Sequence, residues 1–333
     1  MKKAMFNIGD LKAPGPDGLH AIFFKRFWHI LGDELTNEVL DAINNKKIPN
    51  GWNQINIVLI PKVESLEVIN QYSPISLCNV VYKIISKMLA NRLKKILPKV
   101  ISPTQSAFVP GRLITDNVLV AYECFHAIKQ EKDPERSFCA YKLDLSKAYD
   151  RVDWVFLERM MQQLGFSHRW VSWIMECVTS VRYNVKINGA LSDSFAPSCG
   201  LRQGDPISPF LFLFVADGLD ALLKQEIEAT RISPLHVCPQ APGISHLLFA
   251  DDSVLLLKAK PEEAEALREI LDLYEDCSGQ CINLEKSAVM FSPNTGGAAR
   301  TAVKDALHIQ SEKWNEKYLG LPVHVGKSWK KAF

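Results

Sequence analysis

Apolar and polar residues follow both strand-like and helix-like patterns along the chain. A short apolar run at 55–60, INIVLI, is closed by Pro61 and predicts a strand. Residues 83–99 repeat apolar side chains at helical spacing and predict a helix. The other side of that helix carries only basic charges, on Lys83, Lys87, Arg92, Lys94 and Lys95. Such a face is either solvated or turned toward phosphates, and the pattern leaves both interpretations open.

Strand and helix signals alternate through the rest of the chain. Residues 138–145, FCAYKLDL, resemble a strand, and 182–189 ends in Asn188-Gly189, which is typical of a hairpin turn. Residues 246–258 contain two apolar runs that flank a pair of aspartates, so we expect a hairpin with acids at its tip. Helices are expected at 153–164, 168–180, 208–227 and 261–277. The pattern therefore indicates one continuous globular unit that contains both helices and strands.

Composition limits the class of protein without identifying it. The chain has 333 residues, of which 47% are hydrophobic, enough to bury a sizeable core in one domain or two closely joined subdomains. Its 39 basic residues nearly balance 37 acidic ones, giving a formal charge of +2. Net charge thus gives no sign of nucleic-acid binding, and any electrostatic footprint must come from uneven distribution.

Cysteine spacing and hydropathy indicate the compartment. The eight cysteines are scattered, which favours neither a metal site nor a disulfide framework. No apolar stretch follows the two N-terminal lysines, and the strongest apolar run, 209–215, is far too short to cross a bilayer. We therefore expect a reduced, soluble, intracellular protein that does not associate with membranes.

Three aspartates form the strongest candidate for chemistry. Asp144 ends an apolar strand, and Asp251 and Asp252 lie between two others. Adjacent side chains of a strand face opposite ways, so a buried Asp-Asp pair needs a turn or a metal to receive one carboxylate. Two Mg²⁺ ions about 4 Å apart can clamp the attacking and leaving oxygens of a phosphoryl transfer. An ordinary exposed turn explains the Asp-Asp pair equally well when the pair is taken alone.

Eight sequence blocks share one order with a known family. They are KAPGPDGLHAIFFKRFW, SPISLCNVVYKIISKMLANRLKKILP, ISPTQSAFVPGRLITDN, YKLDLSKAYDRVDW, GLRQGDPISPFLFLF, LLFADDSVLLL, SGQCINLEKSAVMFS and KYLGLPV. In this order they resemble the reverse transcriptases of non-LTR retrotransposons, especially plant LINE elements. The resemblance covers nearly the whole chain.

The resemblance implies a fold and a reaction. The implied fold is an α+β right-hand polymerase, with fingers at 1–135, a palm at 136–292 and the start of a truncated thumb-side connection at 293–333. The implied enzyme is an RNA-directed DNA polymerase, a nucleotidyltransferase that adds dNTPs to the 3′-hydroxyl of a DNA primer on an RNA template. It would use two Mg²⁺ ions and act inside the cell, in the nucleus; the resemblance leaves the oligomeric state open.

The resemblance also assigns roles to single residues. Asp144, Asp251 and Asp252 match the metal-binding catalytic triad. Tyr149 matches an aromatic steric gate that excludes a 2′-hydroxyl, although a core tyrosine is the alternative. The nucleotide side of the site would further contain Gln203, Lys83 and Lys286. The template and primer side would contain Gln105, Gly111, Arg112 and Gly204.

Two departures from the family favour an alternative. The family usually has Arg-Pro-Ile-Ser where this chain has Ser73-Pro74-Ile75-Ser76, and we expect neither an upstream endonuclease nor a complete thumb. The alternative is therefore a catalytically impaired retrotransposon relic that at most binds nucleic acid.

Two other enzyme classes share part of the pattern. An RNA-dependent RNA polymerase has a palm with paired aspartates, but it is not expected to carry Tyr149 within SKAYDRVDW. A metal-dependent hydrolase is disfavoured because no histidine stands at ligand spacing from the three acids.

Overall fold

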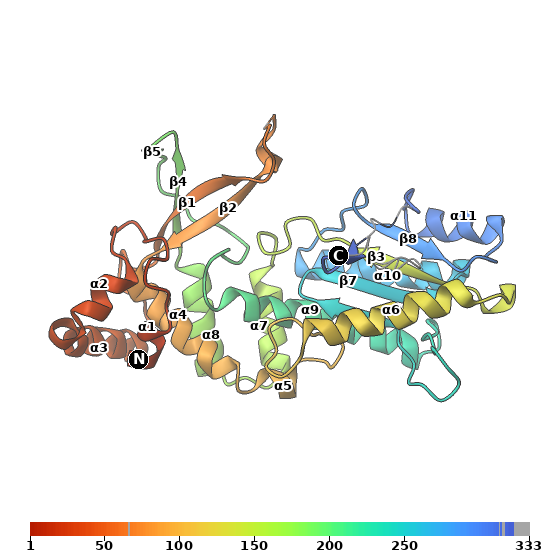
Figure 1. Cartoon of the computed structure of the whole chain (residues 1–333). Helices are drawn as coiled ribbons and strands as arrows, with labels where there is room; N and C mark the ends of the chain where they lie inside the picture. The colour runs from red at the N-terminus through yellow and green to blue at the C-terminus, as the bar shows by residue number, and fades with distance from the viewer. Residues whose placement is uncertain (66, 313, 315–316, 323–333) are drawn as a thin grey trace. The chain divides into compact units, whose positions relative to one another are not determined.

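The chain folds into two compact units, each made of two segments. The computed structural model describes residues 1–65, 67–312, 314 and 317–322. The first unit joins 1–96 to 149–212, and the second joins 97–148 to 213–333 (Figure 1). We describe each unit by itself. This division follows packing, so the fingers, palm and thumb ranges stay a prediction.

The first unit combines helices with a four-stranded sheet of order β2-β1-β4-β5. Strand β1 runs antiparallel to β2 and parallel to β4. The strand expected at 55–60 is confirmed, and so is the hairpin at Asn188-Gly189, whose two residues have φ angles of 49° and 87°. The elements are α1 (Lys2–Phe6), α2 (Ala21–Arg26), α3 (Trp28–Asn45), β1 (Gln54–Pro61), β2 (Tyr72–Cys78), α4 (Val80–Leu93), α7 (Trp154–Gln163), α8 (His168–Thr179), β4 (Arg182–Ile187) and β5 (Ala190–Leu191).

Helix α4 corrects two expectations for residues 83–99. The helix stops at Leu93 because the amides of Lys95 and Ile96 form the shorter i→i+3 bonds of a tightening last turn, and α5 (Leu97–Val100) begins separately. Lys83 does not belong to an exposed basic face: it is buried, and its Nζ donates to the carbonyl oxygen of Ala13 at 2.9 Å. Periodicity misplaced Lys83 because α4 is buried around most of its circumference.

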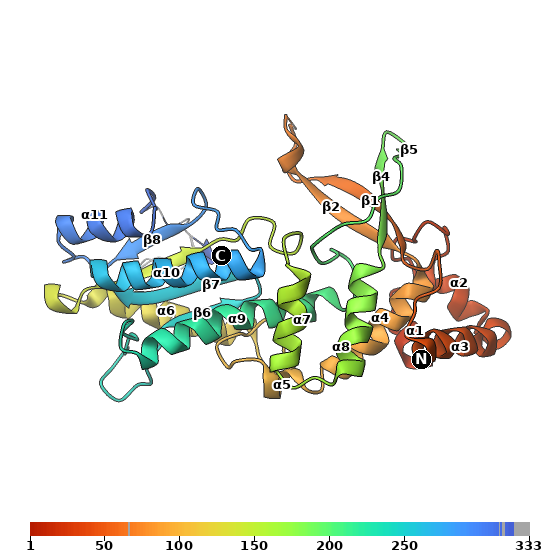
Figure 2. The same ribbon diagram turned by 180° about the vertical axis from the view of Figure 1, so that it is seen from behind.

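The second unit is built on an antiparallel sheet of order β6-β7-β3-β8. Helices α6 and α10 cover opposite faces of this sheet, as the two views show (Figures 1 and 2). The elements are α5, α6 (Ile114–Gln130), β3 (Phe138–Leu143), α9 (Ser208–Glu228, from Leu213 onward), β6 (His246–Phe249), β7 (Asp252–Lys258), α10 (Pro261–Ser278), β8 (Ala288–Phe291), α11 (Gly297–Ala306), β9 (Lys317–Tyr318) and β10 (Leu321–Pro322).

Alternation along the strands gives the second unit two apolar layers. Ala140, Val254 and Leu256 pack with Phe125 and Ile128 of α6 in one buried cluster. The strand residues between them point to the opposite face, which α10 covers. No helix among the described residues is long and apolar enough to cross a membrane.

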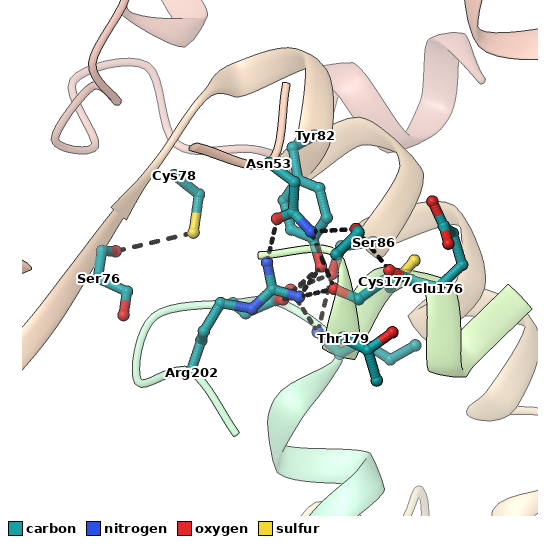
Figure 3. Close-up of polar contacts among 12 residues, drawn as sticks. Asn53, Ser76, Cys78, Tyr82, Ser86, Glu176, Cys177, Thr179 and Arg202 are labelled. Atoms are coloured by element: carbon teal, nitrogen blue, oxygen red, sulfur yellow. Dashed lines mark hydrogen bonds and ion pairs between the residues drawn. The ribbon is translucent and has the colours of Figure 1, made fainter. Parts of the chain in front are cut away.

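A buried ion pair fixes the loop that precedes α9 in the first unit. Arg202 and Asp205 are only 4% and 2% exposed, and their charged atoms lie 3.1 Å apart. The Arg202 guanidinium donates to Asn53 Oδ1, the Tyr82 hydroxyl and the Cys177 carbonyl oxygen (Figure 3). Arg202 thus joins the start of β1, helix α4 and the end of α8.

The carboxylate of this pair is satisfied by helix α4. Tyr82 donates its hydroxyl to Asp205 Oδ2 at 2.7 Å, and Ser86 donates to Oδ1. Burial raises the pKa of Tyr82, so its hydroxyl keeps the proton that it donates. The amide of Ile207 donates to both Ser86 Oγ (3.1 Å) and Asp205 Oδ1 (3.3 Å). Because every charge has partners, the network holds the loop in one conformation.

Removing one member of this pair should be worse than removing both. Arg202→Met leaves Asp205 buried without its counter-charge, which typically costs about 3–5 kcal/mol, whereas apolar replacement of both partners can be nearly neutral. We therefore expect Arg202→Met to lower the free energy of unfolding more than the double variant Arg202→Met/Asp205→Leu. Urea unfolding followed by circular dichroism measures both. Losses that simply add would show that the two charges act independently.

Candidate active site

Asp144 and Asp252 lie on neighbouring strands at the same end of the second unit's sheet. Strand β3 ends at Leu143, which pairs with Ser253 of β7. Extending this antiparallel register by one residue places Asp144 opposite Asp252. Directly opposed residues have Cβ atoms about 4.5–5.5 Å apart. Two carboxylates that are 108 positions apart in the sequence are therefore neighbours in the fold.

Asp251 occupies the turn that leads into β7. Phe249 of β6 pairs with Asp252, which leaves only Ala250 and Asp251 between the two strands. Ala250 has a φ of 55°, a left-handed conformation that is unusual for a residue with a side chain. The hairpin expected at 246–258 is confirmed, and its turn brings the third carboxylate to the same end of the sheet.

Burial and mutual repulsion raise the pKa of two of these carboxyls. The pKa of Asp144 is raised by burial and by the charge of Asp251, while Lys286 and Lys142 act in the opposite direction. The pKa of Asp252 is raised by burial and then by Asp251 and Asp144, with Lys142 again opposing the rise. The charge of Asp251 therefore lies close enough to Asp144 and Asp252 to oppose the ionisation of these two carboxyls.

The three carboxylates alone do not form a complete set of metal ligands. Among the residues that the structure describes, no group of three or more His, Cys, Asp or Glu side chains has the geometry to hold a metal ion. Asp251 is exposed, whereas Asp144 and Asp252 are half-buried. The donor set nevertheless suits a hard cation, because Mg²⁺ takes one or two carboxylates together with phosphate oxygens of a substrate.

The loop before β8 brings Lys286 toward Asp144. The backbone N–H of Asp144 donates to Ser287 Oγ at 3.1 Å, and its carbonyl oxygen accepts from the N–H of Asn283 at 2.9 Å. Lys286 is exposed, and its charge opposes the rise in the pKa of Asp144. Its contact with a nucleotide stays a prediction; the structure shows that its charge acts on Asp144.

Two glycines allow the close approach expected of the GLRQGDP block. Gly200 has a φ of +93°, and a Cβ there would lie 2.6 Å from the carbonyl oxygen of Asp150. Gly204 has a φ of +105°, and its Cβ would lie 3.1 Å from the carbonyl oxygen of Ser76. Gln203 is half-buried, and its carbonyl oxygen accepts from the N–H of Ser76 at 3.0 Å. Close backbone approach is confirmed, whereas contact of Gln203 with a nucleotide and of Gly204 with a primer stay predictions.

Tyr149 is held by stacking within the first unit. Its ring lies 4.9 Å from that of Phe212, centroid to centroid, with 12° between the planes. Its carbonyl oxygen accepts from the N–H of Leu201 at 2.7 Å, so this segment lies beside the loop that carries Gln203. A steric gate and a core tyrosine both require a fixed ring, so the stacking is consistent with either role.

Lys83 and Ser73 lie on elements of the same unit. The pKa of Lys83 is lowered by burial, and its ammonium already bonds Ala13. Ser73 is a half-buried residue of β2 that pairs with Ile60 of β1. Contact of Lys83 with a nucleotide therefore stays a prediction, and the departure at Ser73 falls on a strand rather than a loop.

The template-side candidates direct most of their polar atoms into the chain. Gln105 is 0% exposed, and its Oε1 accepts from the amides of Ala107 and Ala250. Arg112 donates to the carbonyl oxygens of Ser102 and Gln105 at 2.5 Å, and to that of Ile101 at 2.9 Å. Gly111 is exposed with a φ of +84°. Template binding by these three residues stays a prediction.

Sequence reasoning missed three residues that shape these loops. Arg202 and Asp205 carry opposite charges three positions apart between apolar Leu201 and Ile207, and this spacing was an available signal. Asn117 gave no signal: its Nδ2 donates to the Leu248 carbonyl oxygen, 131 residues away, at 3.1 Å. Its Oδ1 accepts from the hydroxyl of Tyr318, 201 residues away, at 2.8 Å.

Asp252→Asn should stabilise the metal-free protein at neutral pH. Because folding raises the pKa of Asp252 above its usual 3.8, its contribution to stability is fully present below pH 3.8 and is lost as pH rises above that value. The gain in melting temperature should be small in acid and grow toward neutrality, where the wild-type Asp252 is forced to carry its charge. Thermal unfolding from roughly pH 3 to pH 7 measures it.

The matched control for this measurement is Asp276→Asn. Asp276 is an exposed aspartate of α10 in the same unit. The control should show no comparable growth of melting temperature with pH. A variant Asp252→Asn that melts below the wild type at neutral pH would contradict the assigned repulsion.

Comparison with known proteins identifies relatives over most of the chain. The model of the family described as reverse transcriptase (RNA-dependent DNA polymerase) matches residues 60–323. The chain is 32% identical over 279 residues to the uncharacterized 149 kDa protein of transposon TX1 from Xenopus laevis, covering 83% of this chain and 20% of that protein. It is 24% identical over 276 residues to the retrovirus-related Pol polyprotein of the type-1 retrotransposable element R2 from Popillia japonica, covering 79% and 36%.

A solved structure shares the arrangement of elements. Apo telomerase from Candida tropicalis, truncated from the C-terminal domain, superimposes with a TM-score of 0.52 at 14% identity, over 81% of this chain and 56% of that one. This likeness confirms the right-hand polymerase fold. The family match across residues 60–323 shows that the chain belongs to the reverse transcriptase family, with relatives among the non-LTR retrotransposons.

Proposed function

We propose that the chain is the polymerase domain of a plant LINE-type non-LTR retrotransposon, which adds dNTPs to the 3′-hydroxyl of a DNA primer on an RNA template. The observation that carries this proposal is the gathering of Asp144, Asp251 and Asp252 at one end of an antiparallel sheet, with two of their pKa values raised. Displaced carboxylate pKa values are typical of sites that do chemistry.

The plant origin is supported by one short match. An uncharacterized mitochondrial protein of Arabidopsis thaliana is 46% identical over 67 residues, which is 20% of this chain and 55% of that protein. The intracellular, nuclear location implied by the family resemblance stays a prediction.

The three aspartates would hold two Mg²⁺ ions. Bound divalent ions would neutralise the carboxylates and polarise the primer and phosphate oxygens that react. The donor set fits them because every member is a carboxylate, and because like charges at one sheet end favour a cation between them. Asp144 and Asp252 are half-buried at the ends of apolar strands, which would fix the donors that the ions require.

The remaining residues would position substrates and offset charge. Lys286 and Lys142 act electrostatically on Asp144 and would help balance the negative charge of a triphosphate. Gln203 would hydrogen-bond the nucleotide, and Tyr149 would lie beneath its sugar. Proteins that catalyse phosphoryl transfer act largely through such positioning and electrostatic stabilisation.

Primer extension tests this function directly. Purified protein should extend a DNA primer on an RNA template with dNTPs and Mg²⁺, while Asp144→Asn and Asp252→Asn should abolish extension without loss of fold. Asp276→Asn, the exposed control on α10, should retain full activity. Extension that is unchanged in either active-site variant would refute the metal assignment. A folded wild-type protein that extends nothing would favour the relic, and extension with rNTPs alone would favour an RNA polymerase.

Tyr149→Ala should weaken discrimination against ribonucleotides. The change deletes the ring that is held by Phe212 and that would collide with a 2′-hydroxyl. Tyr149→Phe keeps the ring and serves as the control, so it should discriminate as the wild type does. Single-nucleotide incorporation gives the ratio of dNTP to rNTP use. If this ratio is the same in all three proteins, Tyr149 is a core residue.

Ser73→Arg should lower the KM for dNTPs by about tenfold. A hydrogen bond from a charged group to a phosphate typically contributes about 1.5–3 kcal/mol to binding. A difference of about 1.4 kcal/mol changes the affinity by a factor of ten. Ser65→Arg adds the same charge beyond β1 and is the matched control. Steady-state titration of dNTPs measures both. An unchanged KM in an active Ser73→Arg enzyme would show that position 73 does not face the triphosphate.

A further inference from the structure

One buried side chain reaches the turn that carries two of the carboxylates. Gln105 Oε1 accepts a hydrogen bond from the N–H of Ala250 at 3.0 Å, and Ala250 directly precedes Asp251 and Asp252. The same oxygen accepts from the N–H of Ala107 at 3.0 Å. The side-chain amide of Gln105 therefore links its own backbone segment to the turn at Ala250, which lies 145 residues further along the sequence.

The backbone around Gln105 runs along strand β6 of the hairpin. Gln105 and Leu248 form an isolated parallel bridge, in which Leu248 N–H donates to Thr104 and Leu248 accepts from Ser106, both at 3.0 Å. Asn117 strengthens the contact by donating to the same Leu248 carbonyl oxygen. The side chain of Gln105 thus extends an existing backbone attachment by two residues, from Leu248 to the turn itself.

The turn needs such a support for two physical reasons. Ala250 has a φ of 55°, and a residue with a side chain adopts this conformation only when its surroundings hold it there. The next two residues carry charges that oppose each other and Asp144. Both strain and repulsion favour other conformations of the turn, and a bond to the Ala250 amide opposes them.

Glutamine brings both a cost and a gain at this buried position. Gln105 Nε2 is buried and has no hydrogen-bond partner among the described residues, which is unfavourable. An apolar side chain of similar size would remove that unpaired donor, but it would leave the buried amides of Ala107 and Ala250 without their acceptor. The cost of the unpaired Nε2 is thus set against an oxygen that bonds the amide of Ala107 and the amide of Ala250 in the turn.

We propose that Gln105 is a positioning residue of the polymerase site, which holds the Ala250 turn so that Asp251 and Asp252 keep the orientation that Mg²⁺ binding requires. This inference rests on the proposed function, because it assigns those carboxylates to the metal. It gives Gln105 a role inside the protein rather than on the template.

Three variants separate positioning from packing. Gln105→Met keeps the volume and removes the acceptor. Gln105→Glu restores an acceptor, and burial near three aspartates should keep this carboxyl protonated. Val303→Ala shortens a fully buried residue of α11, which packs on α10, and is the control for a general loss of stability.

Three readouts are measured on the complete chain. Hydrogen-exchange mass spectrometry of peptides covering 247–252 reports on the turn without any metal. Isothermal titration with Mg²⁺ reports on the donors without any chemistry. Single-turnover primer extension gives the maximal rate and the dNTP affinity separately.

The expected result is specific to the turn. Gln105→Met should exchange faster over 247–252, bind Mg²⁺ about tenfold more weakly and lose a similar factor in maximal rate, with dNTP affinity nearly unchanged. Gln105→Glu should recover much of each loss, and Val303→Ala should show none of them.

Two different failures can be told apart. An active wild type in which Gln105→Met matches Val303→Ala within about twofold in Mg²⁺ affinity and rate would overturn the positioning role alone. A folded wild type that neither binds Mg²⁺ nor extends a primer would overturn the proposed function, whatever exchange at the turn shows.

Discussion

Repulsion among three carboxylates is the constraint around which the second unit is built. The register of β3 and β7 sets Asp144 opposite Asp252, an arrangement that weakens a strand pair when both residues are charged. The rest of the sheet must offset this, and it does so with a run of buried apolar residues, Val254–Leu257, between helices on both faces. The packed apolar part of the sheet can therefore hold the carboxylates at its end in place although their charges repel one another.

Buried polar groups then hold the loops that the sheet cannot hold. In the second unit, the amides of Gln105 and Asn117 bond the backbone of β6 and its turn. In the first unit, Arg202 and Asp205 fix the loop before α9 between β1, α4 and α8. Burial of apolar area does not select one conformation of a loop, because the hydrophobic effect is not directional. Directional bonds in a dry interior do, and one of them is made to Ala250, whose backbone is left-handed.

Local features of the fold were predictable, whereas distant contacts were not. The strand at 55–60 and both hairpin turns depend on a few adjacent residues, and the sequence predicted them correctly. Lys83 was misplaced because helical spacing tells which residues share a face but not how much of the helix is covered. The bond of Gln105 to Ala250 spans 145 residues, and no local pattern carries that information.

A family resemblance indicates which positions belong to a site, but it does not show whether a side chain points into the protein or toward the solvent. Within QSAFVPGR, Arg112 donates to three carbonyl oxygens of its own loop and Gln105 is fully buried, whereas Gly111 is exposed. A guanidinium has five N–H donors in a fixed planar fork, so those bound to the loop cannot also bind a phosphate. Residues whose polar atoms bond inside the fold, such as Arg112, instead hold the backbone of their loop. Lys286, by contrast, is exposed, and its charge acts on Asp144.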